Sequence, residues 1–87
     1  MERGDAFLDR DGASRASYVA GLSDQLIQLQ RAGLLRGFGW YERCVARVGA
    51  ETMASVLADY IAAERSRAEE PAARNLIWAA AEVCDYP

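Results

Sequence analysis

Apolar side chains recur every three or four residues along most of this chain, and this spacing limits the folds it can adopt. Positions spaced in this way lie on one side of an α-helix and give it a face that must be buried. No segment shows the strict alternation of apolar and polar residues that is typical of a strand. We therefore predict an all-α fold, a compact antiparallel four-helix bundle or one with three long helices and one short helix.

The first residues differ from the rest, because they combine glycines and acids with few large apolar groups. We predict a flexible N-terminal arm over residues 1–13 and a single helical domain over residues 14–87. Phe7 and Leu8 are the candidates for a small anchor that holds the arm on the domain. Whether the arm becomes ordered on binding a partner is left open.

The first predicted helix covers residues 14–32. Ser14 or Ser17 is expected to cap its start, because a hydroxyl accepts a hydrogen bond from an exposed backbone N–H. Gly33 follows where a left-handed residue closes a Schellman motif, and this is the clearest boundary in the sequence. Gly21, inside the helix, suggests a close contact with another helix. Three more helices are predicted, over residues 40–48, 51–67 and 71–84.

The last of these helices has an apolar stripe and one large residue off it. Pro71 suits the first turn, where its missing N–H is not needed. The stripe is formed by Ala73, Leu76, Ile77, Ala80, Val83 and Cys84. Trp78 points away from it, and the sequence favours core and interface equally for this indole.

The chain contains no His and no Lys, and its positive charge comes from Arg alone. Without His it lacks the usual general base near neutral pH and the commonest metal ligand. No phosphate-binding loop, dinucleotide fingerprint or metalloprotease motif occurs. No carboxylate falls on an apolar stripe, where burial would raise its pKa. We therefore expect a protein that is not an enzyme and that has no catalytic residue, no cofactor and no metal site.

The two cysteines, Cys44 and Cys84, both fall on apolar stripes. We interpret them as buried thiols in a reducing cytoplasm, because a small secreted domain usually carries several disulfides. A disulfide between them is the alternative. The chain has no apolar run long enough for a membrane span and does not begin with a secretory signal, so the expected location is cytoplasmic.

The net charge of −3 is unevenly distributed. Residues 31–50 carry an excess of Arg, whereas residues 51–87 carry an excess of acids. An acidic protein has no general attraction to nucleic acid, so direct nucleic-acid binding is disfavoured. The C-terminal acids are expected to form an acidic surface, made of Asp59, Glu64, Glu69, Glu70, Glu82 and Asp85.

Aromatic residues and arginines occur together in the middle of the chain, and these residue types dominate the energy of protein interfaces. The alternative for Trp40 and Tyr41 is burial in the core, because small domains bury their largest side chains. The predicted partner-binding residues are Arg36, Phe38, Trp40, Tyr41, Arg43, Arg47 and Trp78.

The same region also invites a helix-turn-helix interpretation, with Gly49 in the turn. Ser55 and Ala58 oppose it, because they occupy positions where the second helix should be apolar. The second helix also has acids and no Arg before Arg65, whereas a helix in the major groove normally brings basic residues.

We therefore expect a small protein-interaction module that docks on a larger protein or forms a homodimer. Size and composition resemble short helical reading frames of phages and mobile elements. One variant follows from the acidic surface: an inhibitor, similar to anti-CRISPR proteins, that covers the nucleic-acid-binding surface of a basic nucleoprotein partner. The alternatives are a helix-turn-helix-like DNA-binding regulator and an accessory subunit of an enzyme.

Overall fold

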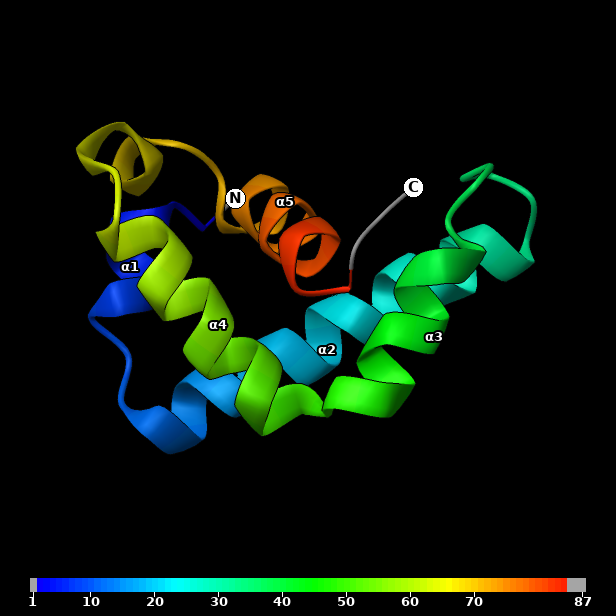
Figure 1. Cartoon of the computed structure of the whole chain (residues 1–87), viewed down its shortest axis with the longest axis horizontal. Coiled ribbons are helices and arrows are strands. Elements are labelled where there is room, and N and C mark those ends of the chain that lie inside the picture. Colours follow the sequence, from blue (N-terminus) through cyan, green and yellow to red (C-terminus); the bar gives the residue numbers. More distant parts are fainter. Residues whose placement is uncertain (1, 85–87) are drawn as a thin grey trace.

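The chain folds into an all-α structure, seen in a computed structural model that describes residues 2–84 (Figure 1). This confirms the predicted fold class. The described residues form no strand, only an isolated bridge between Arg3 and Pro71. The elements in chain order are the helices α1 (Gly4–Leu8), α2 (Gly12–Arg31), α3 (Gly39–Val48) and α4 (Ala50–Ala62), the 3₁₀ helix η1 (Arg65–Glu69) and the helix α5 (Ala72–Val83).

The longest helix, α2, runs along one side of the molecule, and the later helices pack around it (Figure 1). It contacts both α3 and α4, while α5 contacts both α4 and α3. The core lies where these helices meet, and it draws its large side chains from every α-helix. Those that are fully enclosed are Phe7, Val19, Tyr41, Met53, Leu57, Ile61 and Leu76. None of the helices in residues 2–84 combines the length and apolar character needed to cross a bilayer.

The N-terminal segment is part of the packed structure, and here the structure differs from the predicted flexible arm. The Gly4 N–H donates to the Glu70 carbonyl over 2.8 Å, and the Ala72 N–H donates to the Glu2 carbonyl over 2.8 Å. Phe7 has no exposed surface, so its role as the expected anchor is confirmed. An apolar ring that is completely removed from water holds this segment far more firmly than a surface contact would.

The start of α2 is capped by a different residue from those predicted. The carboxylate of Asp11 accepts a hydrogen bond from the Ser14 N–H over 2.8 Å, and the helix begins at Gly12. Asp11 is therefore the N-cap residue, and Ser14 donates the backbone N–H that the cap accepts. Its hydroxyl instead accepts from the guanidinium of Arg10, over 2.7 Å.

The end of α2 is as predicted. Gly33 has a φ of 80°. Its N–H donates to the Gln30 carbonyl over 3.1 Å, and the Leu34 N–H donates to the Leu29 carbonyl over 2.9 Å. These two bonds define the Schellman motif, and they satisfy helix carbonyls that would otherwise have no partner.

Helix α4 corresponds to the helix predicted over residues 51–67, but it ends earlier, at Ala62. The guanidinium of Arg67 donates to the Tyr60 backbone carbonyl over 2.7 Å and lies 3.7 Å from the centre of the Tyr60 ring. A helix leaves its last carbonyls unsatisfied, and here a side chain from η1 takes one of them. Arg67 therefore stabilises the end of α4, although it was expected to lie inside the helix.

The last helix buries a narrower and partly different face than predicted. Leu76 and Ala80 of the predicted stripe are fully enclosed, but Val83 is 41% exposed. Pro71 precedes the first turn as the N-cap residue. Asn75 is buried, and its side-chain amide donates to the Arg67 carbonyl over 2.9 Å. This polar contact fastens η1 to α5.

The cysteines form a disulfide between Cys44 in α3 and Cys84 at the end of α5. The prediction of two free thiols is therefore wrong for this structure, and the alternative holds. The helices bring the two Cα atoms to 5.9 Å, within the range that a disulfide requires. Spacing along the sequence could not reveal this pairing, because the proximity arises only when α3 and α5 pack together.

The disulfide is expected to stabilise the fold by about 4 kcal/mol, because it closes a loop of 40 residues and so restricts the unfolded chain. The test is urea denaturation of the oxidised chain and of the same chain after reduction and alkylation. Equal midpoints for the two forms would contradict the expectation. The Cys44→Ala/Cys84→Ala variant should behave like the reduced chain.

Two glycine substitutions should have opposite effects on stability. A Cβ atom on Gly4 would lie 2.6 Å from the Arg67 carbonyl oxygen, so Gly4→Ala should cost about 1–3 kcal/mol. The expected close helix contact at Gly21 is absent, since a Cβ atom there meets nothing within 4 Å. Gly21→Ala should therefore stabilise α2 by about 0.5–1 kcal/mol. Thermal unfolding of both variants measures the difference, and a change of the same sign in both would contradict it.

Candidate functional site

Four of the predicted partner-binding residues line one hollow in the surface, which we call the aromatic cleft. It has a volume of about 220 Å³ and opens between α5 and the segment that leads into α3. One large side chain would fill a space of this size. The cleft is lined by Arg36, Gly37, Phe38, Trp40, Ile77, Trp78 and Ala81.

Local geometry places the aromatic rings on the α3 side of the cleft. Gly37 has a φ of 72°, a conformation that turns the chain sharply before α3 begins. The ring of Phe38 then lies 5.8 Å from the ring of Trp40, at an interplanar angle of 46°. Tilted pairs at this distance are favourable, so the two rings form a pre-arranged wall.

The opposite wall is the outer side of α5. Trp78 is 56% exposed, a large fraction for an indole, and it is one of the few large apolar side chains on the surface. Ala79 and Ala80, which follow it, are fully buried and bring α5 close to its neighbours. Because the buried face of α5 carries small residues, it leaves no space for an indole.

The disulfide joins the two walls near one end of the cleft. Cys44 lies one helical turn beyond Trp40 in α3, and Cys84 lies three residues beyond Ala81. Relative movement of α3 and α5 is therefore restricted by a covalent bond.

Tyr41 is not part of this surface, which corrects its assignment as a partner-binding residue. The side chain is fully buried, and its hydroxyl shares a hydrogen bond of 2.8 Å with the Ser23 hydroxyl in α2. Burial raises the pKa of Tyr41, and the hydrogen bond from Ser23 offsets part of this effect. The alternative that Tyr41 is a core residue is therefore correct, whereas Trp40 is half-buried in the cleft wall.

The arginines of this region divide into one with an ion-pair partner and three without. Arg31 at the end of α2 pairs with Glu42 in α3 over 2.7 Å, and its hydrogen bond lowers the pKa of that carboxyl. Arg36, Arg43 and Arg47 are exposed and form no ion pair within residues 2–84. We call these three the free arginines.

One of the free arginines lies close to the cleft although it does not line it. A guanidinium nitrogen of Arg43 lies 3.3 Å from the position that a Cβ atom on Gly39 would occupy. Its charge therefore lies over the start of α3, beside the residues that carry the aromatic wall. The side chain of Arg36 lines the cleft itself.

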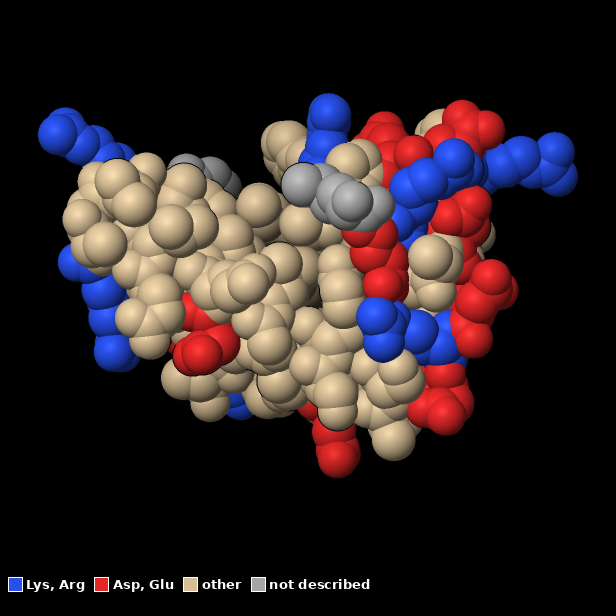
Figure 2. Space-filling model, turned by 180° about the vertical axis from the view of Figure 1, so that it is seen from behind, with Lys and Arg blue, Asp and Glu red and all other residues tan. Residues whose placement is uncertain are grey.

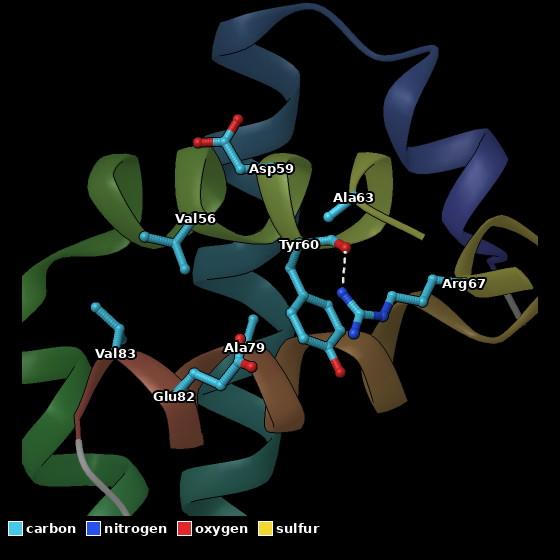
Figure 3. A pocket seen from close by; sticks show the side chains of 8 residues that line it. All are labelled: Val56, Asp59, Tyr60, Ala63, Arg67, Ala79, Glu82 and Val83. Carbon is cyan, nitrogen blue, oxygen red and sulfur yellow. Dashed lines mark hydrogen bonds between the residues drawn. The ribbon is translucent and has the colours of Figure 1, made fainter. Parts of the chain in front are cut away.

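A second hollow, the α4–α5 groove, has a volume of about 490 Å³ (Figure 3). Small apolar side chains form much of its lining. Arg67 lies over the Tyr60 ring at one end of it. The groove is lined by Val56, Asp59, Tyr60, Ala63, Arg67, Ala79, Glu82 and Val83.

The acids of the predicted acidic surface lie in two places within the described residues, along the α4–α5 groove and beside η1. Asp59 and Glu82 both line the α4–α5 groove, but Figure 3 shows the Asp59 carboxylate directed away from α5. Glu70 pairs with Arg74 over 3.6 Å. The other acids of the set are Glu64 and Glu69, exposed beside and within η1, and Asp85, which lies outside the described residues.

Charge is distributed unevenly over the molecule (Figure 2). At the end that contains α1 and η1, acids and arginines are interleaved, so their fields partly cancel. On the face that Figure 2 shows, the end that contains α3 and the α2–α3 connection has mostly uncharged surface, with arginines at its edge and one acidic patch within it. The aromatic cleft lies at the end that contains α3, where Arg36, Arg43 and Arg47 form no ion pair within the described residues.

The α3–α4 pair does not add support to the helix-turn-helix alternative. A single residue, Gly49, with a φ of 87°, joins α3 and α4. The outward side of α4 presents Glu51 and Asp59, which would face the phosphates of a duplex unfavourably.

Sequence reasoning missed the contribution of Ile77 and Ala81 to the cleft. Both lie on the same side of α5 as Trp78, one residue before it and three after it. Ile77 was assigned to the buried stripe, but it is only half-buried. The signal was the helical spacing to Ala81, which lies three residues after Trp78 and four after Ile77.

Comparison with protein-family models, with curated proteins and with solved structures finds no match to this chain. Within residues 2–84, no group of acids or cysteines has an arrangement that would hold a metal ion.

Replacing Trp78 by Ala should change the free energy of unfolding by less than about 1 kcal/mol, because more than half of the side chain is in water. Leu76→Ala on the same helix is the matched control, with an expected loss of about 2–5 kcal/mol for a fully buried side chain. Urea denaturation compares them. A similar large loss for Trp78→Ala would mean that the indole is part of the core.

Proposed function

We propose that this chain is a protein-interaction module without catalytic chemistry of its own, and that it binds its partner through the aromatic cleft. The observation that carries the proposal is the half-exposed indole of Trp78, held in a cleft with Phe38 and Trp40. Isolated exposed apolar residues are common, but a cleft that gathers several aromatic rings resembles the centre of a protein interface.

The structure of the cleft favours binding for a second reason, its rigidity. The two walls belong to helices joined by the disulfide, and the buried hydroxyl pair of Ser23 and Tyr41 fixes α3 on α2. A pre-arranged surface loses little conformational entropy on binding, so more of the contact energy remains as affinity. An accessory subunit would use the same surface in the same way.

The test is site-specific photo-crosslinking in the native host. A benzophenone side chain at exposed Arg74, one helical turn before Trp78, would lie beside the cleft without filling it, and one at Ala62 would lie on exposed α4 as a control. We expect one discrete protein adduct from position 74 that disappears when Trp78→Ala is added. Identical adducts from both positions, or the same adduct without the indole, would refute the proposal.

A further inference from the structure

We infer that the aromatic cleft and the free arginines together receive an acidic segment of a partner protein. One apolar side chain of that segment enters the cleft, and neighbouring carboxylates contact Arg36 and Arg43. This inference rests on the proposed function and adds the chemical class of the partner segment.

The lining of the cleft determines what it can accept. Its hydrocarbon part, with Ile77 and Ala81 beside the aromatic rings, suits an aliphatic or aromatic side chain. The polar groups of Arg36 and Trp78 are hydrogen-bond donors only, because a guanidinium and an indole N–H have no acceptor. A ligand that leaves these donors satisfied must bring acceptors, and a carboxylate is the strongest acceptor in a protein.

The free arginines extend this preference beyond the cleft. They form no ion pair within the described part of the chain, whereas Arg31 nearby pairs directly with Glu42. The charge of Arg43 also helps to lower the pKa of Glu42, but Arg31 makes the larger contribution through its hydrogen bond. Arg43 lies over the start of α3, next to the aromatic wall. Positive charge therefore borders the cleft on the α3 side, and opposite charges on a partner would speed association and fix its orientation.

A nucleic acid fits the same surface less well than an acidic protein segment does. Aromatic rings and arginines also bind single strands, but a strand needs a positive track that follows many phosphates. Here the positive charge is limited to a short stretch, and α4, which follows directly, exposes Glu51 and Asp59.

The experiment selects a displayed library of random short peptides on the oxidised full-length chain, with Trp78→Ala for counter-selection. We expect the recovered peptides to combine one large apolar residue with flanking Asp and Glu, and to contain few Lys or Arg. Neutral or basic peptides whose binding depends on Trp78 would refute the inference that the partner segment is acidic, but they would not contradict the proposed function. Failure to recover any Trp78-dependent peptide would count against both.

Affinity measurements on a selected peptide then test the arginines. The only two tryptophans, Trp40 and Trp78, both line the cleft, so intrinsic fluorescence reports binding directly. Arg36→Ala and Arg43→Ala should each weaken binding about two- to five-fold, the range for exposed charge pairs. Arg65→Ala, which removes the same charge from η1, is the matched control and should have no effect. Equal affinities for all three variants would overturn the inference.

Two competing occupants are tested with the same chain. Tight binding of oligothymidylate that quenches the tryptophans and displaces the selected peptide would overturn the inference in favour of a single-stranded nucleic acid. Concentration-dependent dimerisation in analytical ultracentrifugation, abolished by Trp78→Ala, would overturn it in favour of a second copy of this chain. We expect neither the displacement nor a dimer that depends on the indole.

Discussion

Close packing of α5 through small side chains is the constraint on which the candidate site depends. Ala72, Ala79 and Ala80 have no exposed surface, and they allow the helix to approach its neighbours more closely than larger residues would. Because protein interiors are densely packed, an indole cannot enter such a contact without displacing a helix. Trp78 therefore remains outside, on the side of α5 that faces the aromatic wall. The same alanines that complete the core thus create the exposed ring.

Local signals predicted the fold class and much of the cleft. Helical spacing indicated an all-α chain, and Gly33 marked a boundary to the residue. The position of Trp78 off the apolar stripe left core and interface equally open, and the structure exposes the indole. These features depend on neighbours within one or two turns, which a sequence displays directly. The grouping of Phe38 and Trp40 was also visible, since both belong to one short segment. Tyr41 was less predictable, because its burial depends on a hydroxyl partner in another helix.

The errors share a physical cause, namely contacts between segments that are distant in sequence. The N-terminal segment is held by two backbone hydrogen bonds, from the Gly4 N–H to the Glu70 carbonyl and from the Ala72 N–H to the Glu2 carbonyl. No local sequence pattern predicts these hydrogen bonds. Helix α4 ends at Ala62, and the guanidinium of Arg67 donates a hydrogen bond to the Tyr60 carbonyl. In a longer helix, a backbone N–H would have made that hydrogen bond. Cys44 and Cys84 come together only after α3 and α5 have packed. Composition favoured free thiols, but the disulfide follows from tertiary geometry that composition does not encode.

The two ends of the molecule differ in how their charges are compensated, and this asymmetry connects fold to function. Around α1 and η1, bidentate contacts such as that of Arg10 with Glu2 hold the N-terminal segment in place, so the charges there are used within the fold. At the start of α3, the backbone turn and the disulfide set the geometry, and neither Arg36 nor Arg43 forms an ion pair within the described residues. Charges that do not serve the fold remain available to a partner. The surface beside the cleft therefore combines a rigid hydrocarbon lining with uncompensated donors, a combination that folding alone does not require.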